Sequence, residues 1–430
     1  MSGVNEHGRR SRRHDLMDRF GRDRCGAILP VFALGVTLAL GTAALAIDYG
    51  RWHSERTVLA NTADAAALFG AAVLTTAQAA GNSGDAAARA QAAALSAIQV
   101  NIGDDGTPTI TVTESPGSVK VVLRKQGQRT LSGAILPQDV SISVESEAAV
   151  GPATKTCAIA LDANAAKGIE FDGSGTLTAN NCAIWSNSTS ATSIDAEGSG
   201  GGTATAICAA GGVNTGNYSF NPPPQVNCPP AQDPLAQWMP PAVGTGCYQT
   251  NFQRSGNQTY PLSPGVYCGG ITASGGARLV LSPGLYVIKD GPLRLSGGAS
   301  IEGQAVSFLF TGAGSSVDLG GSSVVHLSAP VDGPMAGLVF AAGRNEPVLA
   351  SQIRGSAELF LEGSVYLPTH NLEFHGGPAA AVPATSTVLI ARTIRFAGNS
   401  TIQFGFQSGT TSMPDHSAQM YIPGNVRLMR

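Results

Sequence analysis

The chain has 430 residues, of which only 13% are charged and 6% are aromatic, whereas glycine alone accounts for 54. This composition is poor for a compact α/β enzyme and is typical of a fold with many turns and tightly stacked small side chains. The formal net charge of −3 excludes a general attraction to nucleic acid, so we expect no nucleic-acid partner.

A membrane anchor is predicted at the N-terminus. Residues 26–47 contain no charged side chain, and about 20 apolar residues suffice to cross a hydrocarbon core of about 30 Å. Residues 1–25 are rich in arginine, and Lys and Arg beside a span stay cytoplasmic. We therefore expect a single-pass protein of the bacterial inner membrane, with a cytoplasmic N-terminus and everything after Asp48 outside.

Two other interpretations of the apolar run remain open. Ala44-Leu45-Ala46 has the form of a signal-peptidase site, so the run could be a cleaved signal peptide. Against this, the run is longer than the apolar core of about 7–15 residues that signal peptides have. A buried core helix is the other alternative, and the arginine-rich flank argues against it.

A helical stalk and a small strand-rich module are predicted over residues 48–150. Small and apolar side chains recur at intervals of three and four residues, at Leu59, Ala63, Ala66, Gly70, Val73 and Leu74. Such a stripe allows another helix to approach closely. A second helix is predicted over Asp85–Val100, after the breaker at residues 81–84. Alternating patterns then predict strands over Thr109–Thr113, Ser118–Arg124 and Val140–Val150.

Residues 24–75 carry motifs of a known family. The three segments are Cys25-Gly26-Ala27, Ala46-Ile47-Asp48-Tyr49-Gly50-Arg51 and Leu59-Ala60-Asn61-Thr62-Ala63-Asp64-Ala65-Ala66-Ala67-Leu68. They resemble the N-terminal module of TadG-like proteins of the bacterial Tad (Flp) pilus-assembly systems, with Asp48, Gly50, Arg51, Asn61, Ala63 and Asp64 as the motif residues. The resemblance implies membership of a pilus-assembly or surface-adherence apparatus, and it implies no particular chemistry.

The C-terminal part resembles the larger members of the same group. The matching pieces are Asn181–Ser188, Asp233–Ala236, Pro283–Ile288, Ala329-Pro330 and Gly337–Phe340. One departure concerns the N-terminus. Type IV pilins carry a glutamate five residues after the glycine of their cleavage site, whereas Val31 stands five residues after Gly26. This argues against processing by a prepilin peptidase and against incorporation as a major pilin.

Residues 151–430 repeat a short theme. The segment Ser263–Tyr267 recurs as Ser282–Tyr286, and the segment Ser274–Ala277 recurs as Ser296–Ala299. A short period, of about 20 residues here, with short strands in each repeat is typical of a stacked solenoid. We predict a right-handed parallel β-helix, with a β-sandwich of hairpins as the alternative. The Pro-rich residues 221–241 are predicted to form a surface loop crossing the side of the solenoid.

Six of the seven cysteines lie in this part of the chain, at Cys157, Cys182, Cys208, Cys228, Cys247 and Cys268. Since the block has no C-x-x-C pair and no histidine, a zinc site is not expected. An even set predicts disulfides and an oxidising compartment. We expect sequential pairing, because the two cysteines of each such pair are separated by close to one repeat. Adjacent coils lie about 4.8 Å apart, within the Cα range of about 4.4–6.8 Å that a disulfide spans.

Two acidic pairs are the candidates for catalysis. Polysaccharide hydrolases need two carboxylates about 5–10 Å apart, and residues two apart in a strand share a face, as do Glu170/Asp172 and Asp195/Glu197. Both pairs stand beside Gly-rich corners, where solvated acids are common. Asp172-Gly173-Ser174-Gly175-Thr176 is predicted to be a turn. We therefore expect no catalytic, cofactor-binding or metal site.

Together these features predict a non-enzymatic, membrane-anchored component of a Tad/Flp-type pilus-assembly or surface-adherence apparatus. The bilayer and other pilus-assembly proteins, which would contact the helical stalk, are the expected partners. Surface glycans or other envelope components are candidate ligands of the periplasmic or surface-exposed β domain. The alternatives are a membrane-tethered polysaccharide-active enzyme and a secreted adhesin.

Overall fold

The computed structural model describes residues 28–79, 83–114, 117–130, 132–134, 140–151, 153–320, 322–355, 358–376, 386–398, 401–406, 414, 416–421 and 426–429. The predicted cytoplasmic tail, residues 1–25, lies outside these ranges.

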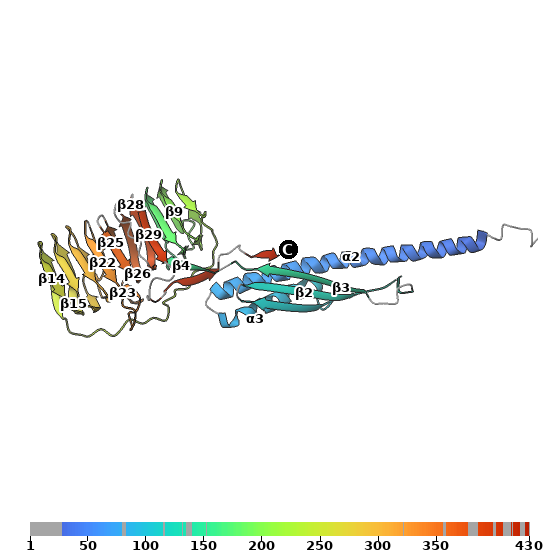
Figure 1. Cartoon of the computed structure of the whole chain (residues 1–430), viewed down its shortest axis with the longest axis horizontal. Helices are drawn as coiled ribbons and strands as arrows, with labels where there is room; N and C mark the ends of the chain where they lie inside the picture. The colour runs from blue at the N-terminus through green and yellow to red at the C-terminus, as the bar shows by residue number, and fades with distance from the viewer. Residues whose placement is uncertain are drawn as a thin grey trace, which may run out of the picture.

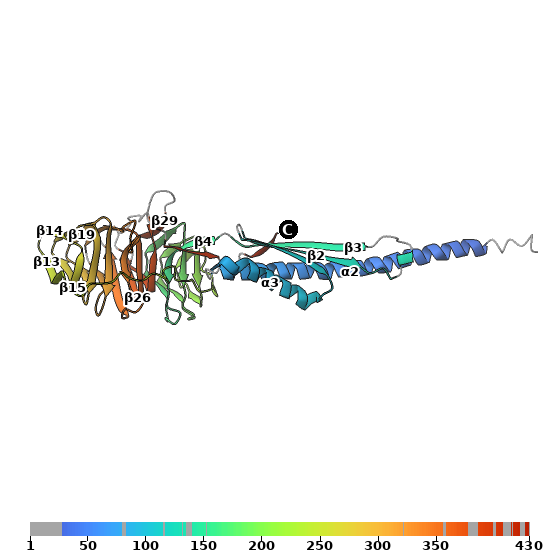
Figure 2. The same cartoon turned by 90° about the horizontal axis from the view of Figure 1, so that it is seen from below.

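The N-terminal module consists of two helices on one face of an antiparallel sheet (Figure 2). The helices are α2 (Ile28–Ala79) and α3 (Ser83–Ile102), and the strands are β1 (Thr107–Thr113), β2 (Ser118–Gly127), β3 (Val140–Ala149) and β31 (Arg427–Met429). The predicted helices and strands of this region are all present. A single turn of 3-10 helix, η2 (Ser132–Ala134), lies between β2 and β3.

Small side chains allow the two helices to pack closely. Ala63, Ala66 and Ala67 of α2 are fully buried. A Cβ atom added to Gly70 would lie 3.1 Å from both the Ala90 carbonyl oxygen and the Ala94 Cβ atom of α3. The small-residue stripe of α2 therefore contacts α3 of the same chain, which the sequence alone did not establish.

The N-terminal part of α2 extends beyond the module as a bare rod (Figure 1). Its 52 residues form one uninterrupted helix, which at about 1.5 Å per residue is about 78 Å long. Large apolar side chains of the bare part are exposed, at Val31, Phe32, Leu34, Leu38 and Leu40. The helix is long and apolar enough to cross a membrane.

Apart from β31, the described rest of the chain forms a parallel β-solenoid, as predicted. Before the Pro-rich segment its strands are β4 (Ala153–Ala160), β5 (Ile169–Gly173), β6 (Thr176–Asn180), β7 (Ala183–Ser186), β8 (Ile194–Gly198), β9 (Gly201–Thr203), β10 (Ala206–Ala209), β11 (Val213–Asn214) and β12 (Ser219–Asn221). After it they are β13 (Gln249–Ser255), β14 (Thr259–Leu262), β15 (Gly265–Ser274), β16 (Arg278–Leu281), β17 (Gly284–Lys289), β18 (Leu293–Leu295), β19 (Ser300–Gly303), β20 (Val306–Thr311), β21 (Val317–Leu319), β22 (Val324–Ser328), β23 (Leu338–Ala342), β24 (Leu349–Gly355), β25 (Glu358–Glu362), β26 (Ser364–Gly376), β27 (Ser386–Thr387), β28 (Leu389–Gly398), β29 (Thr401–Phe406) and β30 (Ala418–Tyr421).

The coils do not stack in sequence order. Strand β28 pairs with β26 on one edge and with β4 and β5 on the other. The stack therefore runs from β13–β14 at the free tip through β26 and β28 to β4, and ends at β10–β12. In Figure 1 the red strands accordingly lie between the orange and the green ones. A coil near the C-terminus of the chain thus occupies the interior of the solenoid.

Residues 222–248, which we call the strap, connect the two ends of this stack. The described strands make about ten coils, so the strap crosses about nine steps of about 4.8 Å, or about 43 Å. Its hydrogen bonds advance along the stack, from Pro229 with Trp185 of β7, through Asp233 with Tyr366 of β26, to Trp238 with Pro334. The predicted Pro-rich surface loop therefore runs along the length of the solenoid and covers its side.

The repeated Ser-Pro-Gly-x-Tyr motif forms a corner of the coil. The hydroxyls of Tyr267 and Tyr286 each donate to the carbonyl oxygen of the serine four residues earlier, Ser263 and Ser282, at 2.7 and 2.9 Å. The intervening Gly284 has a φ of 140°, and a Cβ atom there would lie 2.5 Å from the Pro264 side chain of the preceding coil. The motif recurs because each corner needs a residue without a Cβ atom, where the backbone turns close to the preceding coil.

Candidate functional site

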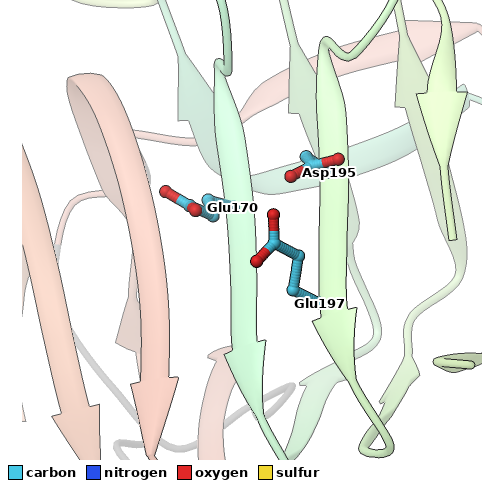
Figure 3. Close-up of side chains that lie close together, drawn as sticks. All are labelled: Glu170, Asp195 and Glu197. Atoms are coloured by element: carbon cyan, nitrogen blue, oxygen red, sulfur yellow. The ribbon is translucent and has the colours of Figure 1, made fainter. Parts of the chain in front are cut away.

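The two acidic pairs predicted from the sequence lie side by side on the solenoid. Strands β5 and β8 pair in parallel, with Glu170 opposite Asp195 and Asp172 opposite Glu197. Carboxylate oxygens of Glu170, Asp195 and Glu197 lie within 4.8 Å of one another. Figure 3 shows these three side chains on the two neighbouring strands, with the Glu197 carboxylate between them.

A lysine lies at the centre of this acidic cluster. The Lys167 Nζ atom is 2.8 Å from Glu170 Oε1, 2.6 Å from Asp195 Oδ2 and 3.2 Å from Glu197 Oε1. Hydrogen bonds to Asp195 and Glu170 raise the pKa of Lys167, so it stays protonated. Burial by itself would raise the pKa of Asp195, but hydrogen bonds from Lys167 and Asn214 outweigh it and lower that pKa. The cluster is therefore an ion-pair network that is charged at neutral pH.

The network continues onto the coil of β28. Arg395 contacts Asp172, lies 2.9 Å from Glu373 on β26, and approaches Glu170 at 3.5 Å. Because Arg395 is the register partner of both Glu373 and Glu170, this arginine joins acids of the two coils on either side of its own. Such a ladder stabilises the stack through charge-assisted hydrogen bonds.

A groove of about 470 Å³ lies beside the network, between the β4–β5 loop and the strands β24, β26 and β28. Its charged lining residues are paired with other groups: Arg392 contacts Asp162 at 2.5 Å and Asn371 at 2.8 Å. A glycoside hydrolase needs one carboxylic acid with a raised pKa that can protonate the leaving group. The pKa of Asp195 is shifted in the opposite direction, so this carboxyl is not suited to act as that acid.

Three disulfides are present, with the predicted pairing. Cys157 of β4 bonds to Cys182, which precedes β7 of the next coil, with a Cα–Cα distance of 5.7 Å. Cys208–Cys228 and Cys247–Cys268 each join a strand to one end of the strap. The reasoning from adjacent coils therefore holds for the first bond and is wrong for the other two, because the strap supplies one cysteine of each.

Residues 225–228 also cover the final strand edge. Cys208 and Gln225 form a parallel bridge, and the Cys228 amide donates to the Ala209 carbonyl oxygen at 2.9 Å. The edge of β10, which could otherwise template pairing with another chain, is thereby occupied.

Two of the family-motif residues, Asp48 and Arg51, form hydrogen bonds with the β2–β3 turn. Asp48 is fully buried, and its carboxylate accepts hydrogen bonds from the Ser132 amide at 2.8 Å, the Ser132 hydroxyl at 2.6 Å and the Thr130 hydroxyl at 2.5 Å. Arg51 donates to the Thr130 hydroxyl at 3.3 Å. The motif thus fixes the β2–β3 turn onto α2.

The other motif residues divide between core and surface. Ala63 is fully buried in the core between the helices and the sheet. Gly50 and Asn61 are exposed, and Asp64 is half-buried.

Sequence reasoning missed the two cations, Lys167 and Arg395, that form ion pairs with the acidic pairs. Lys167 stands three residues before Glu170, which was a usable local signal. Arg395 is more than two hundred residues away in the chain, and no local pattern points to it. Ser351 and His370 were also missed as a pair: their side chains hydrogen-bond at 2.8 Å in the interior, where burial lowers the pKa of His370 to about 4.

Residues 26–73 match the protein-family model described as "Putative Flp pilus-assembly TadE/G-like". The match includes all six motif residues and confirms the resemblance over this segment. No curated protein and no solved structure matches the chain.

Proposed function

We propose that the protein is a non-enzymatic, membrane-anchored component of a Tad/Flp-type pilus-assembly or surface-adherence apparatus. The observation that carries this proposal is the place of the family match. It covers the segment that joins the bare apolar rod of α2 to the folded module, including the buried Asp48 contact. The part of the chain that resembles pilus-assembly proteins is therefore the part that holds the rest beside a membrane.

In the proposed topology, α2 crosses the inner membrane with the N-terminus in the cytoplasm and the solenoid outside. Three disulfides support an oxidising location for the solenoid. The solenoid then serves as a rigid spacer or binding element, since each coil packs on its neighbours through a continuous core.

The proposed partners of the module are helices of other pilus-assembly proteins. The small-residue stripe of α2 is occupied by α3, so these partners must use the outer surface of the helices. Val58 and Phe69 of α2 and Leu95 of α3 are exposed there. Glycans and other envelope components remain proposed ligands of the solenoid.

The acidic network supports a non-enzymatic role, because its carboxylates are bound by Lys167 and Arg395. The rival function, a tethered polysaccharide-active enzyme, rests on the groove beside Glu170. Turnover of pectin, alginate or bacterial exopolysaccharide that vanished with Glu170→Gln, in a chain with unchanged circular dichroism, would establish the rival.

The pilus role is tested by deleting the gene and counting surface pili and attached cells. We expect loss of piliation or attachment, restored by the native chain and by the Glu170→Gln chain. A matched variant, Ala66→Leu, would disrupt the contact between α2 and α3 and should fail to restore it. Normal piliation and attachment in the deletion strain would refute the proposal.

A further inference from the structure

Residues 128–130 and Ser132, the described part of the β2–β3 turn that contacts α2, lie at the same level as the end of the apolar run. Because α2 is unbroken, a residue's height above the hydrocarbon edge follows from its distance to Ile47 at about 1.5 Å per residue. Tyr49 then lies about 3 Å, Arg51 about 6 Å and Trp52 about 8 Å above that edge. The headgroup layer on each side of a bilayer is about 5–8 Å thick. These three residues therefore fall within it or at its outer limit.

Hydrogen bonds hold the turn at this height. Asp48 binds the amide of Ser132, and the Trp52 indole N–H donates to the Gln128 carbonyl oxygen at 3.0 Å. With the contact from Arg51 to Thr130, three successive parts of the turn are fixed to one short stretch of α2. The folded module therefore reaches the headgroup layer with its hairpin as well as with its helix.

The residues at this level suit a lipid surface. We call Tyr49, Arg51, Trp52 and Arg129 the collar. Arg51 and Tyr49 are exposed, Tyr49 to 67%, whereas Arg129 is half-buried and also has a partner within the chain. Of the nearby acids in the described part of the chain, Asp48 is buried by its donors and Glu55 lies 3.8 Å from Lys125. Tyrosine, tryptophan and arginine are the side chains that favour a membrane interface.

We propose that the collar binds the anionic headgroups of the phospholipids through which α2 passes. The module would then contact the membrane at two places, the helix and the hairpin turn. A single helix leaves the tilt of an attached domain free, whereas two contacts fix it, so the solenoid would stand at a defined angle to the bilayer. This inference rests on the membrane anchoring proposed above.

The test uses the full chain in vesicles that contain a nitroxide-headgroup phosphatidylcholine as a fluorescence quencher. Trp52 is the tryptophan beside the membrane, since Trp185 and Trp238 belong to the solenoid and the strap, and a Trp52→Phe chain gives the background. Unlabelled phosphatidylglycerol should displace the quencher from Trp52 better than unlabelled phosphatidylcholine does. We expect this preference to fall about fivefold in Arg51→Gln, and by less in Arg129→Gln, because Arg129 also has a partner within the chain.

Arg89→Gln is the matched control, because Arg89 is an exposed arginine on α3 that lies 4.0 Å from Asp85. It should keep the full preference. Equal thermal unfolding of Arg129→Gln and the native chain would show that the turn is intact. Soluble glycerol phosphate should not displace the quencher, and displacement by it would assign the site to free phosphate and overturn the proposal.

Two failures are distinguishable. If the chain does not float with vesicles, the membrane anchoring itself is refuted. If it floats but phosphatidylglycerol and phosphatidylcholine displace the quencher equally, or if the arginine variants keep the native preference, only the collar is refuted.

Discussion

At the scale of single residues, Lys167 makes the acidic cluster an ion-pair network. Without it, three carboxylates on adjacent strands would repel one another, and one of them, Asp195, has a side chain that is only 3% exposed. A buried charge is tolerated only when it is paired and hydrogen-bonded. The lysine therefore converts an arrangement that resembles a catalytic or metal site into a stabilising contact between coils.

Lys167→Met should destabilise the solenoid by about 3 kcal/mol at pH 7, because it leaves buried charge without its cation. The effect should depend on pH. In the native chain the pKa of Asp195 is lowered from 3.8, so its stabilising contribution is present above that pH and is lost as the pH falls through the folded-state pKa. In the variant, the lysine no longer opposes the effect of burial on the pKa of Asp195. Protonation of Asp195 then removes the cost of its buried charge.

The difference in the free energy of unfolding between the variant and the native chain should therefore become smaller from pH 7 to pH 5. Urea unfolding followed by circular dichroism measures it. Lys289→Met serves as the control, since among the described residues Lys289 makes no ion pair, and it should change stability little at either pH. A difference for Lys167→Met that is independent of pH would contradict the assignment.

At the scale of elements, the strap covers an apolar face of the solenoid. Leu235 is buried among outward-facing apolar side chains of successive coils, including Val287, Leu309 and Ile390. Asp233 adds an ion pair with Arg344 at 2.5 Å. This face of the solenoid is apolar because the strap lies over it, whereas the face with Glu170 and Arg395 carries charges.

Cys228→Ser should release one end of the strap while leaving the coils folded. In the chain-entropy model a loop of this length contributes on the order of 3 kcal/mol. We expect faster proteolysis between residues 229 and 246, together with a red shift of Trp238 fluorescence as its contact with Tyr366 loosens. Cys182→Ser is the matched control, because its disulfide joins two coils and does not involve the strap. Equal protection of the strap in both variants would show that packing alone holds it.

At the scale of the whole molecule, the permuted stack changes which residues are central. Phe396 lies near the C-terminus of the sequence but stacks between Phe171 and Phe374, with ring centroids 5.4 and 6.0 Å away. Phe252 lies near the middle of the sequence but belongs to the tip coil. The chain's last strand, β31, pairs with β3 and so ties the end of the chain to the N-terminal module.

Phe396→Ala should therefore lower the free energy of unfolding more than Phe252→Ala does. The two residues are nearly equal in exposure, at 4% and 5%. We expect about 3–5 kcal/mol for Phe396→Ala and about half of that for Phe252→Ala, whose coil has a neighbour on one side only. Urea unfolding of both variants is the measurement. A larger loss for Phe252→Ala would contradict the coil order.

The candidate site was predictable only in part. The pairs Glu170/Asp172 and Asp195/Glu197 follow from alternation within a strand. A turn was predicted over Asp172–Thr176, and the structure has it at Ser174 and Gly175, between β5 and β6. That the two pairs face each other depends on the register of β5 with β8, and Arg395 joins them through a contact between residues far apart in the chain. The family motif was readable, but its purpose became clear only with the turn that Asp48 binds.

The sequence by itself determined the local features: the apolar run that begins α2, the break before α3, the solenoid period and the Cys157–Cys182 pairing. These depend on neighbouring residues or on a repeat whose spacing is close to one coil. Tertiary structure alone decided the order of the coils, the path of the strap and the ion pairing of the acidic cluster. The reason is that parallel coils of similar shape accept one another at either edge, so the strand period limits the stacking order without specifying it.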